Sequence, residues 1–173
     1  EESLLVMTHS GVTELVFEER AAPPKATVII EQPTLLPERS DGPAVLPLRL
    51  SAATDGPAPL ILVPAGGDLH VWRFDGGWHR IQTLRGVAQA SVAGPREAMG
   101  YEELTSLDLN VGEVDGDGRE DLMACRRGRN HARWLLHRQG PDGTFAEEPR
   151  TVLDDQDLPN VWHGWIDADH DGA

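Results

Sequence analysis

Short apolar runs separated by glycine and proline turns recur along almost the whole chain, and this rhythm limits the fold more than any other feature. The 18 glycines and 13 prolines lie mainly between these runs. The run "LILV" at 60–63 is continuously apolar, as a strand buried on both faces is, whereas "LHVWRF" at 69–74 alternates as a half-buried strand does. "DGG" and "PDG" are typical of hairpin turns, and no long segment has a helical period with caps. The sequence therefore predicts an all-β fold of short antiparallel strands.

The strand pattern also repeats, and acidic turns mark the repeats. The turn at Glu113, Asp115 and Asp117 aligns, 54 positions further on, with Asp167, Asp169 and Asp171. Upstream, at an offset of 62 positions, Asp55, Gly56 and Leu60 align with Asp117, Gly118 and Leu122. After each turn the chain reads as strand, glycine turn, strand, glycine turn and strand. The same alignment places Trp72 and Trp134 on matching second strands, where we expect both to pack between sheets.

These alignments predict one domain over residues 1–173, made of approximate repeats 1–46, 47–108 and 109–166, with a further repeat beginning at 167. Each repeat holds three or four strands. A sheet of this size cannot bury both faces alone, and stacking it on neighbouring sheets solves that problem. A β-propeller is the usual arrangement for four-stranded units of this kind.

The stretch "GEVDGDGREDLM", at 112–123, holds five carboxylates within nine residues. Its carboxylates are Glu113, Asp115, Asp117, Glu120 and Asp121. Ca²⁺ prefers six to eight hard oxygen ligands, and alternate carboxylates on a tight loop converge on one point. Gly116 and Gly118 allow the backbone angles that such a loop needs. Without a cation these carboxylates repel one another and their pKa values rise. We therefore expect the loop to hold an ion.

The stretches "GEVDGDGREDLM" and "DADHDG" resemble the FG-GAP/VCBS repeats of integrin-type β-propellers. The typical form is a D-x-D-x-D-G-x-x-D-L loop that lies between the outer strand of one blade and the inner strand of the next and binds Ca²⁺. The resemblance implies side-chain ligands at Glu113, Asp115, Asp117 and Asp121, a backbone carbonyl ligand at Arg119, and a second site that begins with Asp167, Asp169 and Asp171. Glu113 stands where the family usually has Asp. The upstream copy, with Ser51, Ala53 and Asp55, has lost most of its charge and is predicted to bind no metal.

For the whole chain, the resemblance implies a partial β-propeller of about three blades, each a four-stranded antiparallel sheet, with calcium-binding loops between blades. We expect a non-catalytic scaffold for a protein or carbohydrate ligand, within a larger secreted, periplasmic or cell-surface protein or completed by other chains. Outside the cell, Ca²⁺ is concentrated enough to fill sites of moderate affinity. Trp162 or Trp165, just before the second acidic loop, is a candidate for stacking on a sugar or partner.

The composition of the chain limits the classes of molecule that it can bind. The net charge of −14 argues against nucleic acid and anionic membranes, and no stretch approaches the roughly 18 apolar residues of a membrane helix. The single cysteine, Cys125, lies in "DLMAC", which indicates a buried strand thiol.

Several alternatives remain open at this stage. The acidic loop is either a metal site or a solvated acidic turn. An EF-hand or dockerin loop needs a glutamate at position twelve, where this chain has Ala124. His163 and His170 flank the second loop and offer a transition-metal site as a further alternative. At the level of function, the rivals are the propeller portion of a lyase or dehydratase whose catalytic residues lie outside this chain, and a module of a toxin or adhesin.

Overall fold

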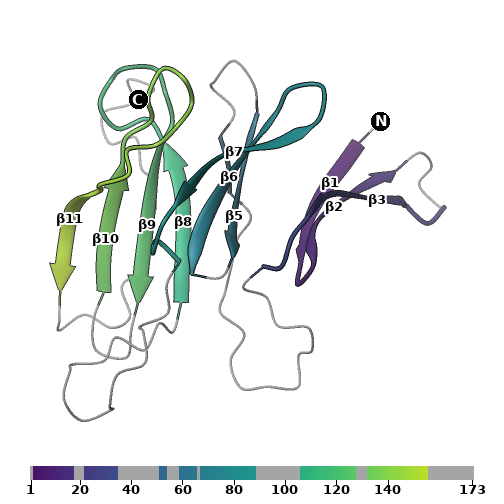
Figure 1. Ribbon diagram of the computed structural model, residues 1–173, viewed down its shortest axis with the longest axis horizontal. Helices are drawn as coiled ribbons and strands as arrows, with labels where there is room; N and C mark the ends of the chain where they lie inside the picture. The colour runs from purple at the N-terminus through teal and green to yellow at the C-terminus, as the bar shows by residue number, and fades with distance from the viewer. Residues whose placement is uncertain are drawn as a thin grey trace, which may run out of the picture.

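The computed structural model describes residues 2–17, 22–34, 51–53, 59–65, 67–88, 106–127 and 132–155. Within these ranges every regular element is a β-strand, and the strands form three antiparallel sheets (Figure 1). The prediction of an all-β fold is therefore confirmed. In the same ranges there is no helix long and apolar enough to cross a membrane.

Each sheet is a meander, in which strands that follow one another in the chain lie side by side. The first sheet contains β1 (Glu2–Thr8), β2 (Gly11–Phe17) and β3 (Lys25–Glu31). The second contains β4 (Ser51–Ala53), β5 (Leu60–Ala65), β6 (Asp68–Phe74) and β7 (Trp78–Leu84). The third contains β8 (Ser106–Gly112), β9 (Asp121–Arg127), β10 (Ala132–His137) and β11 (Arg150–Asp155). Two sheets have the four strands expected, whereas the first has three among the described residues.

The glycine turns lie where the sequence predicts them. Gly76, in the "DGG" turn between β6 and β7, and Gly143, in the "PDG" turn between β10 and β11, both have positive φ angles, of 64° and 77°. Glycine adopts such angles without steric cost. The positions of these two turns therefore follow from local sequence.

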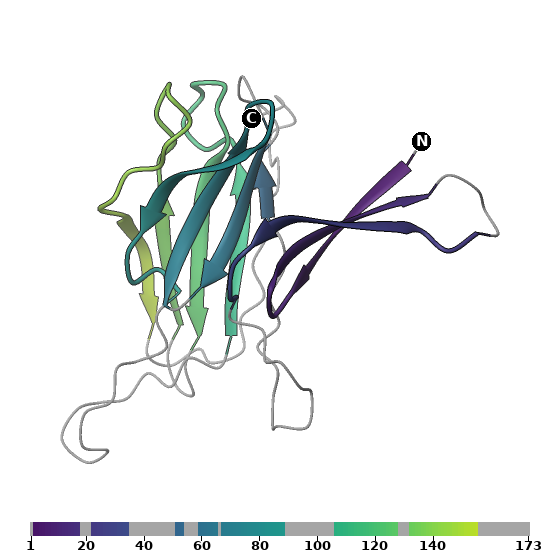
Figure 2. The ribbon, with the colours of Figure 1, turned by 45° about the vertical axis from the view of Figure 1, so that its right-hand side comes forward.

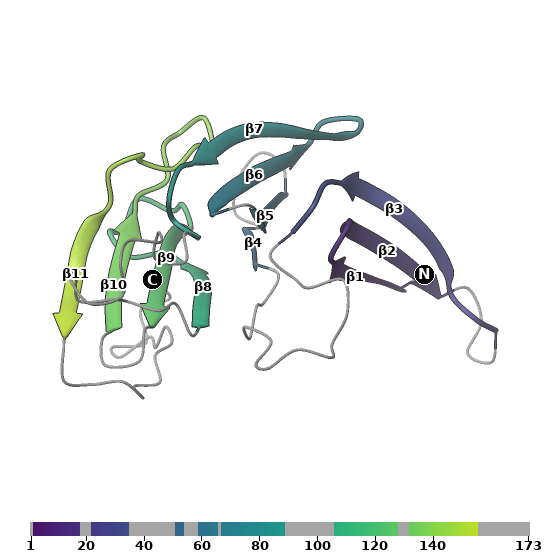
Figure 3. The same cartoon turned by 60° about the horizontal axis from the view of Figure 1, so that its bottom comes forward.

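The three sheets stand next to one another in chain order, with the second sheet between the other two (Figures 1 and 2). In Figure 3 the strands β1, β4 and β8 lie towards the middle of the array, and β3, β7 and β11 lie at its periphery. The inner strands β4 and β8 are in contact. The sheets thus fan outwards from their first strands.

Two apolar layers fill the spaces between the sheets. The first layer lies between the first and second sheets and contains the buried residues Val12, Ile30, Ile61 and Val63. The second layer lies between the second and third sheets and contains Leu60, Leu62, Leu69, Val71, Leu84, Val87, Ala88, Leu109, Leu122, Ala124, Leu135 and Phe145. Successive residues of β5 enter opposite layers because strand side chains alternate between faces. This explains why β5 is apolar throughout.

The offset of 62 positions that aligns the turns does not align the faces of the sheets. Leu60 and Leu122, which it pairs, both pack in the second layer, although one comes from the second sheet and the other from the third. Equivalent residues of consecutive sheets should instead face the same way along the array. The strands β5 and β9 begin at Leu60 and Asp121, which are 61 positions apart, and a shift of one residue exchanges the two faces.

The same shift corrects the prediction for the tryptophans. Trp72 packs against the first layer, as expected of a residue between sheets. Trp134 is buried in a separate cluster with Met123 and Cys125. These side chains lie on the face of the third sheet that is turned away from the second layer, because their neighbours Ala124 and Leu135 enter that layer. Cys125 is buried in a strand, as predicted.

Candidate metal centre

The acidic loop consists of residues 113–120 and joins β8 to β9, two neighbouring strands of the third sheet. The prediction that such loops lie between blades is wrong for this one, since it begins and ends in the same sheet. Antiparallel neighbours need only a short connection, and this loop serves as one. Gly116 and Gly118 have φ angles of 77° and 76°, which confirms the expected use of glycine at these positions.

The loop brings three predicted ligands together. One carboxylate oxygen from each of Glu113, Asp115 and Asp117 lies within 4.8 Å of the other two. Asp115 and Asp117 are exposed, while Glu113 is partly buried. Three converging carboxylates at the surface are a suitable beginning for a divalent cation site, because hard cations take oxygen ligands.

Backbone amides set the positions of two of these carboxylates. Oε1 of Glu113 accepts hydrogen bonds from the N–H groups of Asp115 at 2.9 Å and Gly116 at 2.8 Å. Oδ1 of Asp117 accepts one from the N–H of Arg119 at 2.9 Å. Burial pushes the pKa of Glu113 upwards, but the backbone N–H groups around it outweigh that effect and hold its pKa below the ordinary value. The loop therefore favours a charged glutamate at this position.

Asp121, the fourth predicted side-chain ligand, is buried, and it is not among the three residues whose oxygens converge within 4.8 Å. Its side chain is 0% exposed at the start of β9, and its Oδ1 accepts a hydrogen bond from the N–H of Gln139 at 2.8 Å. Its Oδ2 is buried and has no hydrogen-bond partner among the described residues, and the same is true of Oε2 of Glu113. Burial raises the pKa of Asp121, and the charges of Asp115, Asp117 and Glu113 raise it further. A cation bound to the loop would supply the partner that Oδ2 lacks and would stabilise the charged form.

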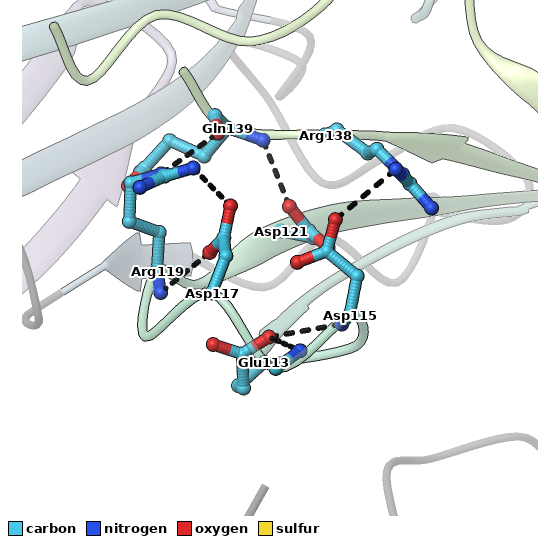
Figure 4. Close-up of polar contacts among 8 residues, drawn as sticks. Glu113, Asp115, Asp117, Arg119, Asp121, Arg138 and Gln139 are labelled. Atoms are coloured by element: carbon cyan, nitrogen blue, oxygen red, sulfur yellow. Dashed lines mark hydrogen bonds and ion pairs between the residues drawn. The ribbon is translucent and has the colours of Figure 1, made fainter. Parts of the chain in front are cut away.

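Two arginines offset part of the negative charge of the loop (Figure 4). The Arg119 guanidinium pairs with Oδ2 of Asp117, and its Nε donates to the carbonyl of Gln139 at 3.1 Å. Nη1 of Arg138 lies 3.2 Å from Oδ2 of Asp115. Surface ion pairs of this type contribute about 0–1 kcal/mol each, so a bound divalent cation can replace them at little cost.

Sequence reasoning placed Arg119 in the site through its backbone carbonyl, and that role stays a prediction. The sequence did not predict the contacts of Arg138 and Gln139, which directly follow the last residue of β10 and contact the acidic loop. No local motif marks them. Their proximity depends on the register between β9 and β10, which pairs Leu122 with His137 and so brings the next residues beside the loop.

The other predicted ligands lie outside the described residues. These are Asp167, Asp169 and Asp171. The candidate stacking residues Trp162 and Trp165, the alternative metal ligands His163 and His170, and Asp55 of the upstream copy, which is predicted to bind no metal, also lie outside them. Scans of this chain against protein-family models, curated proteins and solved structures each found no match. The features of the chain that bear on function are therefore the geometry of the acidic loop and the stacking of the sheets.

Proposed function

We propose that this chain is a calcium-binding piece of a β-propeller that serves as a non-catalytic binding scaffold. The observation that carries the metal part is Asp121, a fully buried carboxylate with one unpartnered oxygen beside three converging carboxylates. Without a cation, the buried Oδ2 of Asp121 stays desolvated and without a partner, which costs free energy. Side-chain oxygens of Glu113, Asp115, Asp117 and Asp121 would hold Ca²⁺, with backbone carbonyls and water completing the shell.

The propeller part is supported by how the sheets stack. Consecutive meanders face each other across apolar layers, and their first strands lie innermost (Figure 3). The outermost faces also carry exposed apolar side chains. Val114 of the acidic loop and Val152 of β11 are 41% and 56% exposed at a groove that Met123, Leu136, Arg150 and Thr151 also line. On the first sheet, Leu4 and Val28 are 53% and 62% exposed. Such faces suit further sheets on both sides, from this chain, from a longer parent protein or from other chains.

The scaffold role follows from what the cation would do. A Ca²⁺ ion in the acidic loop would fix the connection between β8 and β9, and so stiffen one end of the third sheet. Loops held on rigid sheets are common recognition surfaces, and we propose a protein or carbohydrate ligand for this end. A secreted, periplasmic or cell-surface location would supply enough Ca²⁺ to keep the site filled.

The test is Ca²⁺ binding to the full chain, measured by calorimetry and by thermal unfolding with Ca²⁺ or with a chelator. At 100 times the dissociation constant, ligand binding stabilises the folded state by about 2.7 kcal/mol. For a chain of this size that corresponds to a rise in Tm of roughly 5–10 °C. The double variant Asp115→Ala with Asp117→Ala should lose both the heat of binding and the rise in Tm.

A matched control removes two negative charges at exposed positions outside the acidic loop, in the connection between β10 and β11, through Glu147→Ala with Glu148→Ala. This control should bind Ca²⁺ like the original chain. If the original chain shows neither binding heat nor a Tm rise, the loop is only an acidic turn and the calcium proposal fails. An equal loss of binding in both double variants would attribute the effect to net charge and would also overturn the proposal.

A further inference from the structure

The loop between β10 and β11, residues 138–149, connects the acidic loop to the second sheet, and we call it the bridging loop. Three contacts tie it to the acidic loop. The N–H of Gln139 donates to Asp121, the carbonyl of Gln139 accepts from Arg119, and the guanidinium of Arg138 pairs with Asp115 (Figure 4). Gln139 is itself 4% exposed, so its backbone is held in a dry environment.

The bridging loop is braced internally. Gln139 and Phe145 form an antiparallel bridge, and the N–H of Gly140 donates to the carbonyl of Thr144 at 2.7 Å. The N–H of Ala146 donates to the carbonyl of Arg138 at 2.8 Å. These hydrogen bonds hold the backbones of Gln139 and Phe145 side by side.

Phe145 in turn binds the second sheet. The N–H of Phe145 donates to Oε1 of Gln82 at 2.8 Å, and Nε2 of Gln82 donates to the carbonyl of Phe145 at 2.6 Å. The Gln82 side chain, from β7, thus pairs with the loop backbone as a neighbouring strand would. The Arg73 guanidinium also donates to the carbonyl of Asp142, and the Phe145 ring is buried in the second layer.

We propose that a cation bound to the acidic loop locks the third sheet against the second through the bridging loop. The route runs from Asp121 to Gln139, then to Phe145, and finally to Gln82. This proposal rests on the calcium site proposed above and adds a consequence for the neighbouring sheet.

Asp121 can couple the cation to the bridging loop, because its two oxygens have different partners. Oδ2 is the oxygen left for the cation, and Oδ1 already holds the N–H of Gln139. A cation on Oδ2 would fix the whole carboxylate and so would hold Oδ1 in place as the acceptor for the N–H of Gln139. The cation would also take over the carboxylate of Asp115, so that the contact with Arg138 is exchanged for metal coordination. The buried hydrogen bond between Gln139 and Asp121 would then connect the cation to the bridging loop.

The experiment measures amide hydrogen exchange of the full chain by NMR, with Ca²⁺ and with a chelator. Ca²⁺ should slow exchange several-fold at Gln139 and in β7, although β7 contains none of the proposed ligands. The variant Gln82→Ala should still bind Ca²⁺ in calorimetry but lose the slowing in β7. Gln82→Asn, whose shorter side chain cannot make both hydrogen bonds to Phe145, should behave in the same way and guards against a folding defect in the first variant.

Gln32→Ala is the matched control. Gln32 links the first sheet to the second, because its Oε1 accepts a hydrogen bond from Nδ1 of His70 at 2.7 Å. This variant should keep the Ca²⁺-dependent slowing in β7. Binding of Ca²⁺ with no change in β7 of the original chain would overturn the coupling and leave the calcium site standing. Absence of Ca²⁺ binding in calorimetry would overturn both proposals.

Discussion

The two layers between the sheets differ in size and in the groups that cross them. The second layer holds twelve of the buried apolar residues that the structure describes, and the first layer holds four. Paired hydrogen bonds between Gln82 and Phe145 also cross the second layer. Beside the first layer, the described residues place one hydrogen bond, between His70 and Gln32. Buried apolar area is the main source of stability, so the second and third sheets should form the stable unit and the first sheet should separate from it more easily.

The largest effect should come from two neighbouring residues of β5 that enter different layers. Leu62 is 0% exposed in the second layer, and Ile61 is 1% exposed in the first. Truncation of such side chains to alanine costs about 2–5 kcal/mol, with the larger values where the surroundings cannot collapse. We expect Leu62→Ala near the upper end and Ile61→Ala near the lower end in denaturant unfolding. Hydrogen exchange should show Ile61→Ala loosening mainly β1–β3; equal losses and equal exchange patterns would contradict the difference between the layers.

The hydrogen bonds between sheets should give a second, smaller difference in stability between the two layers. Gln82→Ala leaves both the N–H and the C=O of Phe145 without their partner in a partly buried setting, so we expect a loss of about 1–3 kcal/mol. Gln32→Ala removes one hydrogen bond and should cost about 0.5–1.5 kcal/mol. Urea unfolding of both variants beside the original chain measures the difference. A greater loss for Gln32→Ala would show that the polar link at the first layer is the stronger one.

The sequence predicted those features of the fold that local chemistry determines. Alternation in β6, continuous apolarity in β5 and glycine at positions 76 and 143 identified strands and turns without any knowledge of tertiary contacts. The convergence of Glu113, Asp115 and Asp117 was equally local, because the three residues lie within one turn.

Features that depend on register or on distant segments were not available from the sequence. The layer that the side chains of Leu60 and Leu122 enter depends on a shift of one residue, which an alignment of the turns does not detect. The arrival of Gln139 at Asp121 depends on how β9 and β10 pair, 18 residues along the chain from that carboxylate. The position of the acidic loop within one sheet, rather than between two, likewise required the strand order.

The smallest predicted effect concerns two histidines beside the two layers. Burial lowers the pKa of His137, which is 0% exposed and hydrogen-bonds through Nδ1 to the carbonyl of Ala146 at 2.8 Å. Burial, followed by the charge of Arg80, lowers the pKa of His70, which is only partly buried. Because the folded state holds each histidine neutral, the stability that each contributes is complete above the ordinary histidine pKa of about 6.5. It is lost as the pH falls from there through the lowered folded-state pKa.

The loss from one histidine is at most about 1.4 kcal/mol per pH unit, and we expect the greater share from His137 because it is the more deeply buried. Denaturant unfolding at pH 7.5, 6.5 and 5.5 (chosen about one unit either side of the histidine pKa) should therefore show falling stability in the original chain. His137→Asn keeps a donor for the carbonyl of Ala146, so its absolute stability drops through lost packing while its pH dependence flattens. His70→Asn should flatten the curve less. If His70→Asn removes most of the pH dependence and His137→Asn little, the expectation that the more deeply buried His137 contributes the greater share is wrong.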